Sequence, residues 1–331
     1  MKVAINGFGR IGRQVFKILT TKYPEVTIVA VNDLTDVATL AHLLTYDSNY
    51  GVWKAKIGHG ANTLSVDGKE VKVFSEKDPV NLPWGQLGVD VVLECTGFFT
   101  DGEKAKAHLT AGAKKVLLSA PGKNVDATLV LGVNEDKYDK EKHHIISNAS
   151  CTTNGLAPIV KVLVDNFGLE AGLMTTVHSY TNDQRILDAP HEDLRRARNA
   201  ATNIIPTSTG AAKALKEVIP EVEGKLDGIA LRVPTPTVSV TDLTVQLTKA
   251  TTVEDINAKM LEASKGRMKG YLEYVTDPIV SADYKGSEFS AGYDAAMTKN
   301  VGGNLFKIIG WYDNEWGYSC RLAEMAVYIG K

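Results

Sequence analysis

The sequence predicts an α/β protein with two domains: a Rossmann-type doubly wound sheet, and an α+β domain whose sheet is mainly antiparallel. Three observations support this. Short β-branched runs alternate with helical stretches up to about residue 120, and a glycine-rich turn follows the first of these runs. Beyond residue 150 the apolar runs become long and alternating, which is typical of antiparallel strands with one buried face. A chain of 331 residues also suits two domains better than one.

The elements of the first domain follow one another in a regular order. Strands are predicted at residues 2–5, 26–33, 89–97 and 114–120, and helices at residues 13–23, 36–46 and 101–113. This rhythm indicates βαβ units on a parallel sheet.

In the second half, strands are expected within residues 172–181, 229–250 and 304–314. The spacing of Leu322, Met325, Ala326 and Ile329 predicts a last helix that packs back on the body. We therefore expect domains at residues 1–149, joined by the helix at 315–331, and at residues 150–314.

Composition excludes several classes of function. With 44% hydrophobic residues, 23% charged residues and a net charge of -2, the chain has no general attraction for nucleic acid or anionic membranes. No apolar run approaches the roughly 18 residues of a membrane span, and the N-terminus is a glycine-punctuated strand rather than a signal peptide. Cys95, Cys151 and Cys320 form no disulfide or zinc pattern. We expect a cytoplasmic protein with reduced thiols.

A nucleotide site is expected at the N-terminus. Gly7, Gly9 and Gly12 form G-x-G-x-x-G directly after the first strand and at the start of a helix. These glycines allow a tight turn and close approach to a pyrophosphate, which the helix N-terminus attracts. Asp33 ends the second strand, where its carboxylate can bind ribose hydroxyls and repel a 2′-phosphate. The pattern therefore predicts NAD rather than NADP.

Two later strand ends are candidates for the same crevice. Gly97 follows one strand and Ser119 ends another, and ligands of doubly wound sheets bind at such ends. Ordinary turns explain both residues equally well. Cys95 lies in an apolar strand, so a buried, inert thiol is the expected state.

The stretch "ISNASCTTNGLAP" at residues 146–158 surrounds Cys151 with small polar residues. Ser150 can cap a helix that starts at Cys151 and ends at Gly168, and a helix start lowers the pKa of a thiol. His178 ends an apolar strand and can act as the partner base, sharing a thiolate–imidazolium pair with Cys151. From the residues alone, a small residue at a helix start and a structural histidine remain alternatives.

Three stretches suit anions. Thr209 and Gly210 precede a helical run, and "DLRRARNA" at residues 193–200 contains Arg196. A solvated or subunit-bridging charged face is the alternative for these arginines. Arg232 lies in an apolar strand, where a buried guanidinium requires a negative partner such as a phosphate.

These motifs together resemble phosphorylating glyceraldehyde-3-phosphate dehydrogenase. The motifs are "INGFGRIGR", "SNASCTTNGLAP", "TVHSYTNDQ", "DLRRAR", "PTSTGAAKA", "LRVPTP" and "WYDNEWGYS", and they occur in order over essentially the whole chain. The resemblance implies NAD-dependent oxidation of glyceraldehyde 3-phosphate through a cysteine thiohemiacetal and thioester, with inorganic phosphate as the second substrate. It also implies a homotetramer.

The resemblance assigns roles to individual residues. Cys151 matches the nucleophile and His178 the base. Thr181 and Arg232 match the pocket for the substrate's own phosphate. The attacking phosphate corresponds to Ser150, Thr152, Arg196, Thr209 and Gly210, and the NAD site to Gly7, Gly9, Arg10, Ile11, Gly12, Asp33, Lys77, Gly97, Ser119 and Asn314.

Other interpretations are less well supported. Erythrose-4-phosphate dehydrogenase shares the scaffold and thiol chemistry, but "PTSTGAAKA" favours the triose enzyme. A different class would be a protein that binds RNA or a host surface, and the charge of -2 gives it no support as the primary function. One departure from the family is Gly155, at a position where many members carry a second cysteine.

Overall fold

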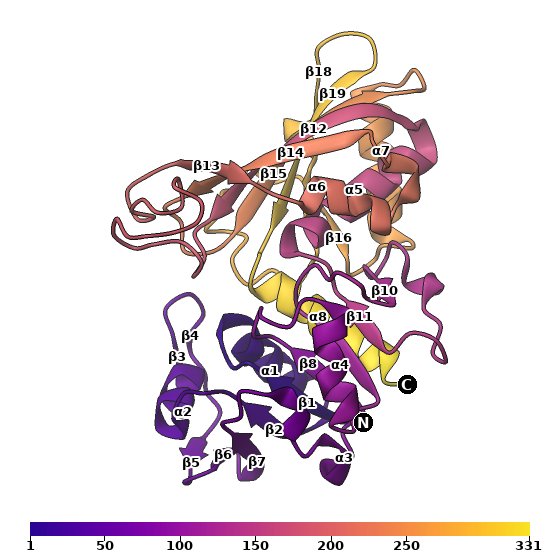
Figure 1. Ribbon diagram of the computed structural model, residues 1–331. Coiled ribbons are helices and arrows are strands. Elements are labelled where there is room, and N and C mark those ends of the chain that lie inside the picture. Colours follow the sequence, from indigo (N-terminus) through magenta and orange to yellow (C-terminus); the bar gives the residue numbers. More distant parts are fainter. The chain divides into compact units, whose positions relative to one another are not determined.

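A computed structural model describes all residues from 1 to 331, and the chain forms two compact units (Figure 1). The first comprises Met1–Leu129, Asp136–Ala149 and Ser319–Lys331, and the second comprises Val130–Glu135 and Ser150–Tyr318. Helix α8 (Trp316–Ile329) begins in the second unit and ends in the first. No helix is long and apolar enough to cross a membrane.

The first unit contains a nine-stranded sheet in the order β10-β11-β9-β8-β1-β2-β7-β6-β5. Its strands are β1 (Lys2–Asn6), β2 (Thr27–Asn32), β5 (Ile57–His59), β6 (Thr63–Val66), β7 (Lys69–Phe74), β8 (Val91–Glu94), β9 (Lys115–Leu118), β10 (Ala127–Thr128) and β11 (Ile145–Ser147). All neighbours pair in parallel except β5–β6 and β6–β7, which pair antiparallel. A separate hairpin joins β3 (Tyr46–Asp47) to β4 (Gly51–Val52).

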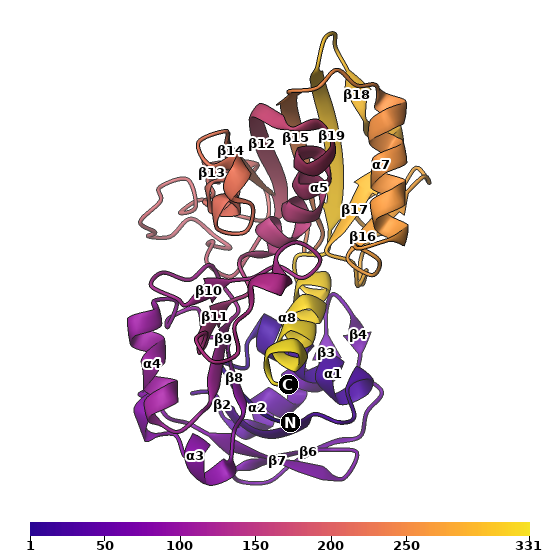
Figure 2. The same ribbon diagram turned by 90° about the vertical axis from the view of Figure 1, so that its right-hand side faces the viewer.

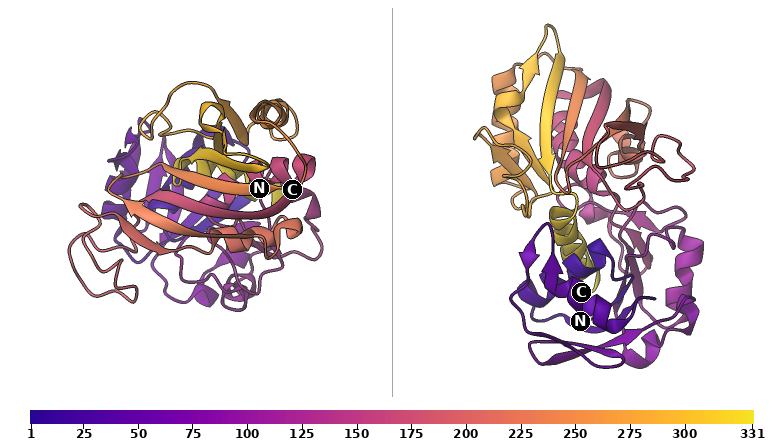
Figure 3. Two further views of the ribbon diagram at one scale, coloured as in Figure 1. Left: turned by 90° about the horizontal axis from the view of Figure 1, so that it is seen from above. Right: turned by 90° about the vertical axis from the view of Figure 1, so that its left-hand side faces the viewer.

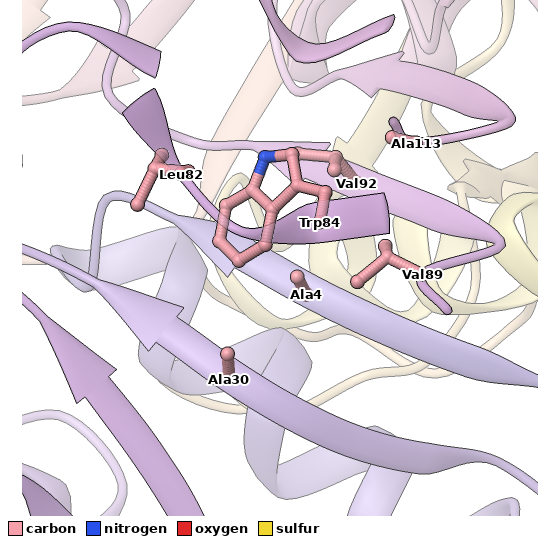
Figure 4. Close-up of a cluster of buried hydrophobic side chains, with 7 residues drawn as sticks. All are labelled: Ala4, Ala30, Leu82, Trp84, Val89, Val92 and Ala113. Atoms are coloured by element: carbon pink, nitrogen blue, oxygen red, sulfur yellow. The ribbon is translucent and has the colours of Figure 1, made fainter. Parts of the chain in front are cut away.

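Helices α1 (Arg10–Lys22), α2 (Val37–Thr45), α3 (Trp84–Leu87) and α4 (Gly102–Thr110) accompany this sheet (Figure 2). Trp84 is fully buried and packs over small residues of the strands, among them Ala4 and Ala30 (Figure 4). Alanines at these positions leave room for the indole, so α3 can lie close to the sheet.

The second unit is built on an eight-stranded mixed sheet in the order β13-β14-β12-β15-β19-β17-β16, with β18 beside β19. Its strands are β12 (Leu169–Ser179), β13 (Ile205–Ser208), β14 (Leu226–Val233), β15 (Ser239–Leu247), β16 (Leu272–Val275), β17 (Ala291–Asp294), β18 (Lys299–Asn300) and β19 (Leu305–Tyr312). Only β12–β14 and β16–β17 pair in parallel. Its helices are α5 (Cys151–Phe167), α6 (Ala211–Ala214) and α7 (Val253–Lys265).

One face of this second sheet is covered and the other is not. Buried and half-buried residues alternate along β15, and the buried face includes Thr241. Ile159 of α5 packs against Gly310 beside Thr241, which places α5 on that face. On the opposite face Leu173 and Ile229 are 69% and 50% exposed. Figure 3 shows the long strands side by side, from β14 (orange) to β19 (yellow).

Register within this sheet aligns two predicted site residues. His178 on β12 and Arg232 on β14 are direct partners in the parallel ladder. The predicted fold class, a doubly wound sheet with a mainly antiparallel second sheet, is confirmed.

Candidate active site

A cavity of about 450 Å³ lies at the carboxyl ends of β1, β2 and β8 in the first unit. Four predicted cofactor residues line it: Gly7, Gly9, Asp33 and Lys77. The remaining lining residues are Asn6, Asn32, Leu34, Glu76, Cys95, Thr96, Phe98 and Phe99, which the sequence analysis did not select. Gly97 lies between two lining residues, Thr96 and Phe98, without lining the cavity itself, and Ser119 does not line it.

The glycine-rich turn has the backbone that a pyrophosphate requires. Gly7 has a φ of 90°, in the left-handed region that favours glycine. A Cβ on Gly12 would lie 2.1 Å from the Gly7 carbonyl oxygen, whereas a Cβ on Gly9 would meet nothing within 4 Å. Helix α1 starts at Arg10 and has no acidic residue in its first turn, so its positive end is uncompensated.

Asp33 closes the cavity on the β2 side. Its carboxylate accepts hydrogen bonds from the backbone N–H groups of Phe8 (2.7 Å) and Thr35 (2.9 Å), which fixes its orientation. A carboxylate has about four acceptor positions, so it can still accept bonds from ribose hydroxyls. The open backbone at Gly9, the free helix start and this acceptor together fit a dinucleotide such as NAD.

A buried polar network supports the wall of the cavity. Glu94 ends β8 and accepts hydrogen bonds from Asn6 Nδ2 (2.6 Å), His108 Nε2 (2.9 Å) and the Thr96 backbone N–H (2.8 Å), as well as from the Thr96 hydroxyl. Trp84 Nε1 donates to His108 Nδ1 at 3.0 Å, which leaves the His108 proton on Nε2, facing Glu94.

Beside this network, burial raises the pKa of the Cys95 thiol to about 12, and the Glu94 charge acts in the same direction. The Cys95 side chain therefore stays a thiol.

The predicted nucleophile and base lie together in the second unit. Ser150 caps α5, its hydroxyl accepting from the Thr153 N–H at 2.9 Å, and Cys151 is the first helical residue. The Cys151 Sγ is 3.5 Å from His178 Nε2. Helix α5 ends at Gly168, as predicted.

The ionisation predicted for this pair is wrong in direction. Burial raises the pKa of the Cys151 thiol, although the Arg232 guanidinium, the Thr152 hydroxyl and the N–H groups of the helix start all act to lower it. Burial, with Arg232 nearby, lowers the pKa of His178 to about 3. The pair therefore rests as a thiol and a neutral imidazole, because the cost of removing charge from water exceeds the benefit of the helix start.

Arg232 lies at the centre of the predicted substrate-phosphate pocket. Its Nη1 is 3.1 Å from the Ser179 carbonyl oxygen, 3.2 Å from Thr181 Oγ1 and 2.9 Å from His178 Nδ1. Its Nε is buried without a hydrogen-bond partner. Such an unsatisfied donor on a buried cation suits an anionic ligand.

Arg196 connects to this pocket through Asp183. Arg196 Nη1 lies 2.6 Å from an Asp183 carboxylate oxygen, and Asp183 accepts from the Thr181 hydroxyl. Arg196 also binds Thr207 Oγ1 at 3.0 Å. Thr209 Oγ1 accepts from the Ala211 N–H at the start of α6, where Gly210 is the residue before the helix.

Two buried residues, Tyr312 and Asn314, complete the second unit's site. Tyr312 OH lies 2.9 Å from Thr152 Oγ1 and 2.7 Å from Thr176 Oγ1. Asn314 Oδ1 accepts hydrogen bonds from Ser179 and Ser239 hydroxyls, both at 3.0 Å. Tyr312 lies within the motif "WYDNEWGYS", but no local pattern indicates its role, because its partners become apparent only from the folding of β12 and β19.

Comparison with known proteins identifies the family. The NAD-binding domain model of glyceraldehyde 3-phosphate dehydrogenase matches residues 1–102, and the C-terminal domain model matches residues 150–314. The glyceraldehyde-3-phosphate dehydrogenase of Geobacillus stearothermophilus is 59% identical over 329 residues, which cover 99% of this chain and 98% of that protein. The chain belongs to the glyceraldehyde-3-phosphate dehydrogenase family.

Other members are similarly close. Glyceraldehyde-3-phosphate dehydrogenase 2 of Streptomyces avermitilis and glyceraldehyde-3-phosphate dehydrogenase 1 of Bacillus subtilis are both 57% identical, over 330 and 331 residues. Each alignment covers 100% of this chain and 98% of the relative. The chain is an NAD-dependent oxidoreductase of this family, as the sequence predicted.

Proposed function

We propose that Cys151 and His178 are the nucleophile and base with which this chain oxidises D-glyceraldehyde 3-phosphate and phosphorylates the product to 1,3-bisphosphoglycerate. The observation that carries the proposal is the 3.5 Å contact between Cys151 Sγ and His178 Nε2. It lies beside the Arg232 guanidinium, whose buried Nε has no hydrogen-bond partner. The relatives named above are glyceraldehyde-3-phosphate dehydrogenases, which supports this substrate.

The first step joins the thiol to the aldehyde. His178 Nε2 accepts the Cys151 proton, the thiolate attacks the aldehyde carbon, and the proton returns to the new alkoxide to give a thiohemiacetal. A neutral imidazole is required for this step, and the 3.5 Å contact places its Nε2 within reach of the thiol.

His178 then takes the thiohemiacetal hydroxyl proton as the carbonyl re-forms. NAD, when bound, supplies the acceptor for the hydride that leaves the same carbon. Cys151 now holds a thioester. Inorganic phosphate attacks its carbonyl carbon, the carbon–sulfur bond breaks, and the acyl phosphate leaves while Cys151 regains its thiolate.

Two anion sites serve this sequence. Thr181 and Arg232 are proposed to bind the phosphate that the substrate already carries. The attacking phosphate is assigned to hydroxyl and N–H donors at the starts of α5 and α6 and to one guanidinium from the loop between β12 and β13: Ser150, Thr152, Thr209, Gly210 and Arg196. Such donors match the geometry of phosphate oxygens.

The cofactor residues belong to the same proposal. Gly7, Gly9, Arg10, Ile11 and Gly12 would hold the pyrophosphate at the start of α1, and Asp33 the adenosine ribose. The roles of Lys77, Gly97, Ser119 and Asn314 stay predictions from the family resemblance. Asn314 Oδ1 is held by two serine hydroxyls, which leaves its Nδ2 to act as a donor.

One experiment tests the activity. NADH formation from glyceraldehyde 3-phosphate is followed with and without inorganic phosphate, and beside erythrose 4-phosphate. We expect sustained turnover only with phosphate, and a higher kcat/KM for the triose. Faster turnover of erythrose 4-phosphate would favour the alternative substrate, and phosphate-independent turnover would exclude acyl-phosphate formation.

Assembly and location are part of the proposal. A homotetramer is supported by the uncovered sheet face of the second unit, where Leu173 and Ile229 are exposed. Analytical ultracentrifugation tests it.

We place the enzyme in the cytoplasm because a catalytic thiol requires a reducing compartment. No primary role with nucleic acid is proposed, given the net charge of -2.

A further inference from the structure

Tyr312 and Gly155 are the buried neighbours of the reacting groups that the mechanism leaves without a role. Tyr312 ends β19 and is 1% exposed. Its ring lies edge-on to the His178 ring at 6.0 Å between centroids. Gly155 lies one helical turn after Cys151 on α5 and is buried against the Tyr312 ring. A side chain this close to the base and to Thr152 can affect the reaction without touching substrate.

The hydroxyl hydrogens around Tyr312 have one arrangement that satisfies them all. Burial raises the pKa of Tyr312, so its oxygen keeps one hydrogen to donate. Thr176 is 1% exposed, and its hydroxyl contacts only Tyr312, so Thr176 must donate to Tyr312. Tyr312 then donates to Thr152 Oγ1. This leaves the Thr152 hydrogen free to point elsewhere.

The free Thr152 hydrogen has a use at the thiol. Thr152 directly follows Cys151, and its hydroxyl acts to lower the pKa of the Cys151 thiol. The charged or titratable groups that face Cys151 are His178 from β12, Arg232 from β14 and Tyr312 from β19. Aligned hydroxyls polarise one another, so the chain from Thr176 through Tyr312 strengthens Thr152 as a donor.

Gly155 allows the phenol to reach this position. A Cβ on residue 155 would lie 2.8 Å from Cγ and 3.0 Å from Cδ1 of Tyr312. Carbon atoms pack no closer than about 3.5 Å, so the ring would have to retreat by roughly 0.7 Å. The 2.9 Å hydrogen bond to Thr152 would then exceed the usual range for two hydroxyls.

We propose that Tyr312 is a positioning residue that orients the Thr152 hydroxyl toward the thiolate and the attacking phosphate, and that Gly155 is required for its position. The phosphate part of this inference rests on the function proposed above, whereas the thiolate part does not.

The test compares Tyr312→Phe, Gly155→Ala and the double variant with wild type. Iodoacetamide alkylation of Cys151 is measured against pH by peptide mass spectrometry, which separates it from Cys95 and Cys320. For Tyr312→Phe we expect the profile to move up by roughly half to one pH unit. We expect the KM for inorganic phosphate to rise about three- to tenfold, with the KM for glyceraldehyde 3-phosphate changed less than about twofold.

The double variant distinguishes a positioning role of Tyr312 from simple packing. Gly155→Ala should move both measurements in the same direction, and the double variant should match Tyr312→Phe alone rather than the product of the two effects. Ile159→Val is the matched control, since Ile159 packs between α5 and β19 at Gly310. It should leave the alkylation profile unchanged.

Three results would overturn the inference: an unshifted profile in Tyr312→Phe, multiplicative effects in the double variant, or an equal shift in Ile159→Val. Alkylation needs no turnover, so its result stands even if wild type fails to oxidise glyceraldehyde 3-phosphate. That failure would refute the proposed function by itself.

Discussion

Replacing Glu94 with glutamine tests whether the cofactor wall depends on a buried carboxylate. Glu94 is 3% exposed and accepts four hydrogen bonds, two on each oxygen. Glutamine has the same shape, but one of its terminal atoms is a donor. Every partner of Glu94 is also a donor, so Glu94→Gln places donors against donors in either orientation of the amide.

The size of the effect follows from counting these bonds. The least costly orientation turns the amide nitrogen toward Thr96, whose hydroxyl can rotate to accept, and leaves only the Thr96 backbone N–H unsatisfied. An unsatisfied buried donor costs about 1–3 kcal/mol, and the bonds from Asn6 and His108 lose the strength that the charge gave them. We expect a loss of about 2–4 kcal/mol in the free energy of unfolding, a large share of a typical total.

Urea unfolding followed by circular dichroism measures this loss. Glu70→Gln on β7 is the control, because Glu70 is exposed and should change stability by less than about 0.5 kcal/mol. NAD affinity should fall roughly three- to tenfold, since Asn6 and Thr96 line the cavity. A loss of less than about 1 kcal/mol in Glu94→Gln would show that the network does not hold a charged carboxylate.

Four further predictions concern the site. Cys151→Ser should abolish NAD-dependent oxidation while leaving NAD binding nearly intact, and residual activity above about a tenth of wild type would refute the nucleophile. Arg232→Ala should raise the KM for phosphorylated aldehydes and leave unphosphorylated ones almost unchanged; equal effects on both would remove its role with phosphate. Gly12→Ala should weaken NAD binding at least about tenfold in a calorimetric titration, because its Cβ would lie 2.1 Å from the Gly7 oxygen; unchanged affinity would contradict the close approach. The pKa of His178 is about 3 in the folded chain, against about 6.5 when unfolded. The unfolded state therefore binds more protons between these pH values, and the free energy of unfolding decreases as the pH is lowered. About 2 kcal/mol should be lost between pH 7 and pH 5, and a His178→Asn variant with the same pH slope in urea unfolding would disprove this.

The sequence was most informative where spacing along the chain determines geometry. Gly7 and Gly12 lie where a strand meets a helix, and Ser150 precedes Cys151 as a cap does, so local chemistry sufficed to predict the glycine-rich turn and the capped helix start. His178 could be paired with Cys151 because a helix and a returning strand bring their ends together.

The thiol pKa and the buried polar contacts could not be predicted from the sequence, because they depend on burial and on residues far apart in the chain. The pKa of the Cys151 thiol rises because burial outweighs the helix start, and burial cannot be judged before the fold is known. Glu94 and His108 are 14 residues apart, and Asn6 lies 88 residues from Glu94, so no local pattern joins them. Tyr312 was overlooked for the same reason.

The pairing of β12 with β14 has a consequence for which substrate lengths the site accepts. His178 and Arg232 are aligned by the hydrogen-bonded ladder itself, so the separation between the proposed proton acceptor and the proposed phosphate-binding residue is set by the main chain. Adjacent strands stand about 4.8 Å apart, and a slip of one residue would send one of the two side chains to the other face of the sheet. The register of β12 and β14 therefore fixes the distance between the positions proposed for the aldehyde and for the substrate phosphate. Substitutions of single side chains leave that distance unchanged.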